Sequence, residues 1–244
     1  MKKIGIIVQA RSTSSRFNRK IFKKIYKNYS VLEFLLRRLN SLGKKYKLII
    51  GTTKKDQKKI SNISKKYNFT VDIGSERNVL SRFYKIAKKN KLETVVRINS
   101  DSPLLIDNLI DKYLIQFIKN KKIDYMTNIL QPSFPYGLAI EIFKFNALKK
   151  AFLNAKNKQQ KEHVTPYIYQ NKKKFLISHI LNKKNLSKYR FCIDFPQDLK
   201  LLKIIIRKSK LGTNLSYIDA INIIKKEKKL IKINEKFNST FFIK

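Results

Sequence analysis

The chain has one cysteine, Cys192, and two histidines, His163 and His179, among 244 residues. A single cysteine cannot form an internal disulfide, so a disulfide-stabilised scaffold is excluded and a cytoplasmic location is expected. Two distant histidines without a His-Glu-x-x-His spacing exclude a typical zinc cluster. The sequence also lacks the glycine-rich dinucleotide and P-loop signatures and the Gly-x-Ser-x-Gly elbow, which disfavours dehydrogenases, P-loop enzymes and α/β-hydrolases.

Long apolar runs are missing as well. Lysine, asparagine or aspartate interrupts every candidate before it reaches the length of a membrane span, so we expect no transmembrane segment. Met1, Lys2 and Lys3 resemble the charged start of a signal peptide. The apolar stretch that follows, residues 4–8, is too short for secretion.

Acidic residues are scarce, since 56 lysines and arginines face 16 aspartates and glutamates, giving a net charge of +40. Such an excess usually favours nucleic-acid binding. Here the chain is also rich in isoleucine and asparagine and poor in glycine, proline and alanine, which is the mark of AT-rich codons. The lysines are scattered, and aromatic residues do not alternate with them as in an RNA-binding sheet. We therefore expect no nucleic-acid partner.

Apolar residues make up 43% of the chain, enough for a sizeable core, and no glycine- or proline-rich linker divides it. The first half alternates between apolar strand patterns and amphipathic helix patterns, which predicts βαβ units and a mainly parallel sheet in an α/β fold. Ser30 is the expected cap of the first helix and Gly43 its stop. The expected strands are 3–8, 47–52, 70–73 and 94–99, and the expected helices are 31–42, 55–67, 78–90 and 107–120.

The second half is less regular. We expect a single domain, 1–244, in which residues 1–120 bind a nucleotide and residues 121–244 form an acceptor portion with closing helices. The expected strands there are 124–128, 139–143, 175–181 and 190–193, and the expected helices are 146–155, 160–171, 197–209 and 217–228.

The first predicted strand breaks into a polar loop that carries Arg11, Arg16 and Lys20. In open α/β sheets, ligands bind outside the carboxyl ends of the strands. Backbone N–H groups and fixed cations in such a loop would hold a phosphate chain and neutralise a pyrophosphate leaving group. The alternative is a solvated basic loop in a very basic chain.

Two aspartates, Asp101 and Asp194, each follow the end of a predicted strand. Carboxylates in that position hold Mg²⁺ together with substrate phosphates, and the metal polarises the phosphorus for in-line attack. The alternative is that each caps the helix that follows, which suits Asp-x-Pro. On pattern alone, His163 and Cys192 fit structural roles.

Six short motifs in chain order resemble those of the SpsF-like cytidylyltransferases of spore-coat polysaccharide synthesis, relatives of the CMP-Kdo and CMP-sialate synthetases. The resemblance covers nearly the whole chain, and the segment 162–169, Glu-His-Val-Thr-Pro-Tyr-Ile-Tyr, matches without change. The other matching residues are Gln9-Ala10-Arg11, Ser14, Arg16, Lys20; Gly74-Ser75, Val79-Leu80, Arg82-Phe83; Arg97-Ile98, Asp101, Pro103-Leu104; Pro135, Gly137-Leu138, Glu141; and Asp194, Pro196, Asp198-Leu199.

This resemblance implies a nucleotide-diphospho-sugar transferase fold of the GT-A type, and transfer of CMP from CTP to a sugar or sugar acid with release of pyrophosphate under Mg²⁺. It also implies a homodimer. The implied catalytic residues are Arg11, Lys20 and Asp101, and the implied metal ligands are Asp101 and Asp194. The implied nucleotide-binding residues are Gln9, Ala10, Arg11, Ser14, Arg16, Lys20 and Arg82, and the implied acceptor-binding residues are Tyr136, Glu141, Glu162 and His163.

The chain departs from the family pattern in two places. Thr13 stands where the family has glycine, and Asn18-Arg19 where it has Pro-Gly; a β-branched residue resists positive φ, so we expect the loop to follow a different path. Tyr136 and Ala139 replace frequent aspartates, which favours a more acidic acceptor. Competing hypotheses are a GT-A glycosyltransferase, which would need an Asp-x-Asp motif, and a catalytically silent relative that binds polyanions.

Overall fold

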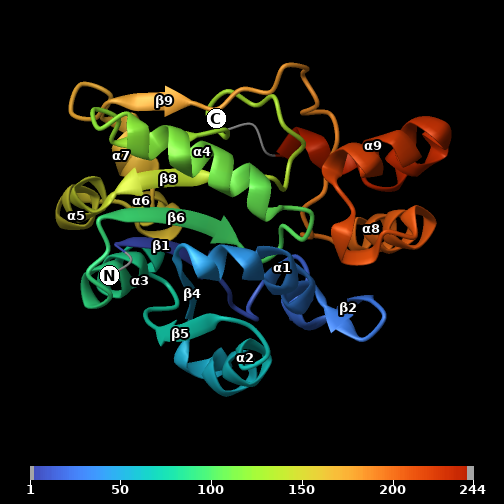
Figure 1. The fold of residues 1–244 in the computed structure, drawn as a ribbon, viewed down its shortest axis with the longest axis horizontal. Coiled ribbons are helices and arrows are strands. Elements are labelled where there is room, and N and C mark those ends of the chain that lie inside the picture. Colours follow the sequence, from blue (N-terminus) through green and yellow to red (C-terminus); the bar gives the residue numbers. More distant parts are fainter. Residues whose placement is uncertain (1–2, 241–244) are drawn as a thin grey trace.

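The computed structural model describes residues 3–240 and has a seven-stranded sheet at its centre, in the order β5-β4-β1-β6-β8-β7-β9 (Figure 1). Met1 and Lys2 of the signal-like start and residues 241–244 of the predicted domain lie outside the described residues. The four strands predicted in the first half are confirmed and pair in parallel: β1 (Ile4–Gln9), β4 (Lys47–Thr52), β5 (Phe69–Ile73) and β6 (Thr94–Asn99). The predicted α/β class with a mainly parallel sheet is therefore confirmed.

The other half of the sheet contains its one reversed strand. β8 (Glu141–Lys144) runs antiparallel to β6 and to β7 (Tyr125–Thr127), and β7 pairs in parallel with β9 (Ile177–His179). Along the chain, β4 and β5 extend the sheet from one side of β1, and β6 then returns to the other side. This change of direction between β1 and β6 opens a crevice at the carboxyl ends of the two strands.

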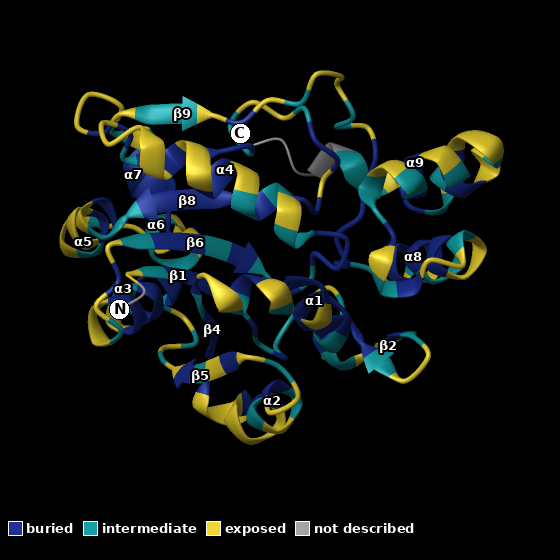
Figure 2. Cartoon of the chain, in the orientation of Figure 1, coloured by how far each residue is buried: buried dark blue, intermediate teal, exposed yellow. Residues whose placement is uncertain are grey.

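Helices cover both faces of the sheet, whose strands are mostly buried (Figure 2). Side chains alternate along β1, so that Ile6 and Val8 join one apolar cluster with α1 and α4, while Ile7 joins another with α3, α5 and α7. Figure 1 shows α8 and α9 past the carboxyl end of β6. The helix bounds are α1 Val31–Leu39, α2 Gln57–Ser64, α3 Val79–Lys89, α4 Asp107–Lys119, α5 Phe145–Asn154, α6 Lys158–His163, α7 Pro166–Gln170, α8 Pro196–Ser209 and α9 Tyr217–Lys226.

The predicted cap of α1 is confirmed, but its predicted stop is wrong. The Ser30 side chain accepts from the Glu33 backbone N–H, and Glu33 reaches back to the Ser30 N–H, so the two residues form a capping box. The α-helical bonding ends at Leu39, and Gly43 lies inside a 3-10 segment, Asn40–Lys44, that continues the turn. None of the helices in the described part of the chain has the length and apolar character needed to cross a membrane.

Two predictions for the second half are wrong. The expected helix 160–171 is two short helices, α6 and α7, because Val164 between them has φ 72°. The expected strand 190–193 is only an isolated bridge between Arg190 and Tyr136, since its backbone bonds to loops. The sequence patterns also missed the hairpin β2 (Lys24–Tyr26) and β3 (Tyr29–Ser30).

Arg19 stands at the position where the family pattern has glycine, and its backbone is in the left-handed region, with φ 54° and ψ 27°. The left-handed region costs a residue with a Cβ about 1–2 kcal/mol, whereas glycine enters it without that cost but loses more chain entropy on folding. Arg19 is exposed, so its replacement removes no buried contact. We expect Arg19→Gly to raise the free energy of unfolding by about 0.5–1 kcal/mol in urea denaturation. Arg19→Ala keeps the Cβ and is the matched control; an equal gain for alanine would contradict the backbone explanation.

Candidate active site

A cavity of about 810 Å³ opens at the carboxyl ends of β1 and β6. The register that pairs Gln9 with Asn99 brings the two strand ends to the same edge, so their loops line the same cavity. Of the residues predicted for the site, those lining it are Gln9, Arg11, Ser14, Arg16, Lys20, Asp101, Tyr136, Glu141, Glu162, His163 and Asp194. Ala10 and Arg82 are fully buried and do not line it.

Lys20 joins the two aspartates that the sequence singled out. Its Nζ donates to Asp101 Oδ2 at 2.6 Å and to Asp194 Oδ1 at 2.7 Å, and Arg16 donates to the same Asp194 oxygen at 2.7 Å. Burial by itself would lower the pKa of Lys20, but the charges of both carboxylates outweigh it and raise that pKa. Lys20 is therefore a fixed cation at neutral pH.

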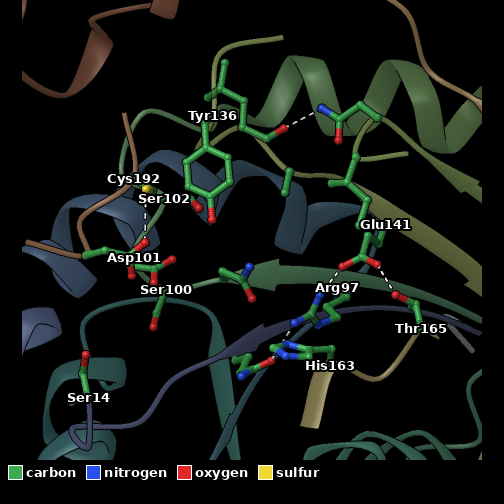
Figure 3. A pocket seen from close by; sticks show the side chains of 18 of the residues that line it. Ser14, Arg97, Ser100, Asp101, Ser102, Tyr136, Glu141, His163, Thr165 and Cys192 are labelled. Atoms are coloured by element: carbon green, nitrogen blue, oxygen red, sulfur yellow. Dashed lines mark hydrogen bonds and ion pairs between the residues drawn. The ribbon is translucent and has the colours of Figure 1, made fainter. Parts of the chain in front are cut away.

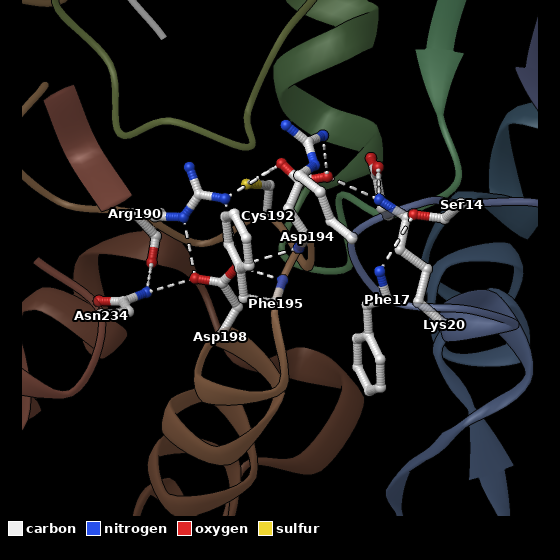
Figure 4. A network of polar contacts seen from close by, with 11 residues as sticks. Ser14, Phe17, Lys20, Arg190, Cys192, Asp194, Phe195, Asp198 and Asn234 are labelled. Atoms are coloured by element: carbon white, nitrogen blue, oxygen red, sulfur yellow. Dashed lines mark hydrogen bonds and ion pairs between the residues drawn. The ribbon is translucent and has the colours of Figure 1, made fainter. Parts of the chain in front are cut away.

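Arg190 donates a hydrogen bond to the Asp194 carboxylate, a contact that the sequence motifs did not predict (Figure 4). Its guanidinium is fully buried and donates to Asp194 Oδ2 at 3.0 Å and, through Nε, to Asp198 Oδ1 at 2.8 Å. Asp198 also accepts from the backbone N–H groups of Asp194 and Phe195. These bonds fix the Asp194 carboxylate, whose Oδ1 is the oxygen that accepts from Lys20 and Arg16.

The pKa of Asp194 reflects this arrangement. Burial would raise it, but the charges of Lys20, Arg16 and Arg190 together hold the pKa of this carboxyl below its usual range. Asp194 is therefore an anion at neutral pH, although its side chain is only 5% exposed.

A second group of polar side chains lies across the cavity from Asp101 and Tyr136 and centres on buried Glu141 (Figure 3). Glu141 accepts from the Tyr125 hydroxyl at 2.7 Å and from Thr165, and it forms an ion pair with Arg97. Arg97 also donates to Gln9 Oε1 at 3.3 Å, which connects this group to the end of β1. The resemblance implies that Glu141 binds the acceptor, and in the structure its negative charge is balanced by the positive charge of Arg97.

The loop after β1 is held by acidic residues from other elements. Ser12 donates its N–H to Asp56 at 2.7 Å, the Thr13 hydroxyl donates to Glu76 at 2.7 Å, and Arg11 donates to the Glu76 carbonyl at 3.2 Å. Thr13 is not among the residues with positive φ. The departure from glycine therefore leads to a side-chain bond to Glu76, and Arg19 is the loop residue in the left-handed region.

His163 ends α6 at a strained turn. Thr165 donates its N–H to the His163 carbonyl at 2.9 Å across Val164, whose φ of 72° and ψ of −54° form the rarer hand of γ-turn. A β-branched residue is an outlier there, and such strain persists only where packing imposes it; Val164 is fully buried. Burial lowers the pKa of His163, so the imidazole is neutral at pH 7.

The Tyr136 side chain lines the cavity and packs against the Arg190 guanidinium. The Cζ atom of Arg190 lies 4.9 Å from the centre of the Tyr136 ring. Gly137, the next residue, has φ 99°, and a Cβ there would lie 2.3 Å from the Cys192 nitrogen. This close approach packs the loop of Tyr136 onto the segment that carries Asp194. Burial is the main cause that raises the pKa of Tyr136, and the charges of Cys192, Asp194 and Asp101 raise it further. The phenol therefore stays protonated.

Arg82 is a fully buried cation near the loop. Its Nη1 donates to the Ser75 carbonyl at 3.1 Å, whereas Nε and Nη2 have no partner within residues 3–240. Burial, together with the charges of Arg11 and Arg97, lowers the pKa of Arg82 to about 10. Unpartnered buried N–H groups carry a free-energy cost of roughly 1–3 kcal/mol each, which an acceptor atom of a ligand would relieve.

The donor set of the cavity suits a magnesium ion. Asp101 and Asp194 present oxygens that converge on one point, the Nζ of Lys20. Mg²⁺ is usually held by one or two carboxylates together with substrate phosphates and water, rather than by an all-protein cage. Residues 3–240 contain no group of three or more His, Cys, Asp or Glu that could hold a metal by themselves.

Comparison with known proteins gives consistent matches. A sequence model of the family described as cytidylyltransferase matches residues 5–237. A solved cytidylyltransferase from Leptospira borgpetersenii serovar Hardjo-bovis is 32% identical and superposes with a TM-score of 0.88, covering 95% of this chain and 97% of that one. An uncharacterized protein of Methanocaldococcus jannaschii is 40% identical over 206 residues, 82% of each chain. The spore coat polysaccharide biosynthesis protein SpsF of Bacillus subtilis is 28% identical over 232 residues, 92% of this chain and 95% of that one.

Proposed function

The chain belongs to the cytidylyltransferase family and is a CTP-dependent nucleotidyltransferase, and on that premise we propose that it transfers CMP to a hydroxyl of a sugar or sugar acid and releases pyrophosphate. The observation that supports this most strongly is the convergence of Lys20, Asp101 and Asp194 in one cavity with Arg11 and Arg16. Such a site can bind a triphosphate, a divalent metal and an acceptor together.

In this proposal, the cations of the first loop bind the phosphates. Arg11, Arg16 and Lys20 would contact the β- and γ-phosphates and neutralise the charge that develops as pyrophosphate leaves. Asp101 and Asp194 would hold Mg²⁺, which supplies positive charge to the phosphate oxygens when bound. The acceptor hydroxyl would then attack the α-phosphorus and lose its proton to water, and the new P–O bond would form as the bond to the pyrophosphate oxygen breaks.

The nucleoside would lie on the side of the loop that faces Arg82. Gln9, Ala10 and Ser14 supply the surrounding backbone and side chains, and Arg82 offers the two N–H groups that lack partners within the described chain. A cytosine presents acceptor atoms that such donors would satisfy. This placement follows the family pattern, and because Arg82 is fully buried and does not line the cavity, its contact with the nucleoside would require the side chains that cover it to move.

The acceptor would occupy the part of the cavity between Tyr136 and His163. Glu141 is neutralised by Arg97, and Glu162 lies 3.6 Å from Arg11, so neither carboxylate presents an unbalanced negative charge to a ligand. Tyr136 adds a neutral phenol where relatives often have aspartate. These features favour an acidic acceptor, and the family pattern points to a sugar acid of the 2-keto-3-deoxy class.

Pyrophosphate release tests the proposal directly. The protein is incubated with Mg²⁺, each of the four nucleoside triphosphates and a panel of 2-keto-3-deoxy sugar acids and neutral sugar phosphates. We expect release only with CTP, and faster release with a sugar acid than with its neutral counterpart. Equal release with neutral sugars would contradict the acidic acceptor, and absence of both release and CTP binding by calorimetry would contradict the transferase function.

A further inference from the structure

The Lys20 ammonium lies beside Asp194 (Figure 4) and also contacts Asp101, so it occupies the point where the two aspartates proposed to hold the metal converge. Its Nζ is 2.6 Å from Asp101 Oδ2 and 2.7 Å from Asp194 Oδ1, and its side chain is 10% exposed. These oxygens are the ones that a divalent cation would need. An ammonium and a divalent cation cannot share that point, because two positive charges a few ångströms apart in a buried site repel strongly.

Asp194 has little capacity left for a further cation. Oδ1 accepts from Lys20 and Arg16, and Oδ2 accepts from Arg190. Asp101 is the more accessible carboxylate, with 23% of its side chain exposed. A metal ion that entered the nucleotide-free protein would therefore have to displace Lys20 and leave a buried ammonium without a partner, which is unfavourable.

We propose that Lys20 is a tethered placeholder for the divalent cation, which keeps the metal out of the nucleotide-free protein and releases the two carboxylates when a triphosphate arrives. This inference rests on the proposed function. The triphosphate gives the Lys20 ammonium a new anionic partner, and the freed Asp101 and Asp194 then take the metal that comes with the nucleotide. Metal and nucleotide binding are thereby coupled, and each increases the affinity of the other by the same factor.

The remaining contacts of Asp194 fit this exchange. Arg190 is fully buried and fixed by Asp198, so it keeps Asp194 Oδ2 in place whether Lys20 or a metal occupies Oδ1. The exchange therefore needs movement of two side chains on the loop after β1, Lys20 and Arg16, which both donate to Asp194 Oδ1, and no rearrangement of the sheet. Lys20 moves from the carboxylates to the phosphates, and the metal replaces it.

Binding of Mn²⁺ to the nucleotide-free protein tests the placeholder role, with free Mn²⁺ measured by electron paramagnetic resonance. Lys20→Met removes the charge and keeps an apolar stem in the buried position. We expect Lys20→Met to bind Mn²⁺ at least about tenfold more tightly than the unaltered protein, a factor within the usual range of coupling between sites. The same variant should lose turnover. Lys20→Ala should gain as well. Lys24→Ala, which removes an exposed lysine of β2, should leave Mn²⁺ affinity unchanged.

The double variant Lys20→Met, Asp101→Asn should lose the gain, because one of the two oxygens is no longer a carboxylate. Melting temperatures identify the variants that fold. Equal Mn²⁺ affinity in the unaltered protein and in a folded Lys20 variant would overturn the inference. Failure of the proposed function would give a different result. In that case pyrophosphate would not be released from CTP with any acceptor, but the Lys20 variants would still bind Mn²⁺ more tightly than the unaltered protein, because Lys20 would still occupy a cation site.

Discussion

Asp101→Asn is expected to lower kcat/KM for CTP by about a thousandfold, because a metal that stabilises charge in phosphoryl transfer contributes several kcal/mol to the barrier. The substitution keeps the shape of the side chain and removes its charge. Asp101 Oδ2, the atom that contacts Lys20, would become part of a neutral amide and would hold a divalent cation weakly. The measurement is initial-rate pyrophosphate release under saturating Mg²⁺.

The fold should survive this change. The Asp101 side chain is partly exposed, and the backbone carbonyl that accepts from the Ile193 N–H at 2.9 Å is unaffected. The matched control is Asp107→Asn at the start of α4, which should keep near-normal turnover because Asp107 does not line the cavity. Near-normal turnover of Asp101→Asn, with an unchanged melting temperature, would remove Asp101 from the metal site.

The position of Asp101 could be read from the sequence because it depends on local order. An apolar run predicts a buried parallel strand, and a polar residue just past its end must lie at the ligand-binding edge of the sheet. Lys20 is 81 residues from Asp101 and lies further along the loop that follows β1, and the two side chains meet because β1 and β6 are neighbours in the sheet. The residue types themselves indicated a phosphate and Mg²⁺ site, and the resemblance then added CTP as the nucleotide and a sugar or sugar acid as the acceptor.

The buried ion pair of Arg190 with Asp198 was missed for a different reason. Asp198 fits the first turn of a helix, and it does accept the Asp194 and Phe195 N–H groups there. The pattern gave no indication that the same carboxylate also pairs with a buried arginine. The sequence did contain a signal for the contact with Asp194. Arg190 begins an apolar segment, where a buried cation needs an anionic partner, and Asp194 follows four residues later.

The turn at Val164 could not be predicted from local preferences. A β-branched residue disfavours positive φ, and the helical pattern of residues 160–171 continues through it. The break depends on distant groups: the Val164 side chain is buried in the cluster of α3, α5 and α7, and the Thr165 hydroxyl bonds to Glu141 on β8. Tertiary packing overrides the local preference and places His163 and Thr165 at the cavity.

Arg190→Met is expected to lower the free energy of unfolding by about 3–5 kcal/mol, the usual effect of removing one partner from a buried ion pair. Arg190 is the shared partner of Asp194 and Asp198, whose side chains are 5% and 0% exposed. Lys20 and Arg16 would still contact Asp194, but the Asp198 carboxylate would keep only backbone N–H groups and Asn234. The measurement is urea denaturation at pH 7, with the exposed Arg207→Met of α8 as the control.

The pH dependence separates a lost charge from lost packing. The cations around Asp194 hold its folded pKa below the unfolded value, so their contribution to stability is present at neutral pH and disappears as pH falls through the folded pKa. Without Arg190 the pKa of Asp194 is lowered less, because only Lys20 and Arg16 remain beside it, so this contribution is smaller in the variant. The stability deficit of Arg190→Met should therefore stay constant from pH 7 to about pH 4 and shrink as the pH falls below the ordinary aspartate pKa. A deficit that does not shrink below about pH 4 would mean that Arg190 supports the site through packing under Tyr136 and Phe195 rather than through its charge.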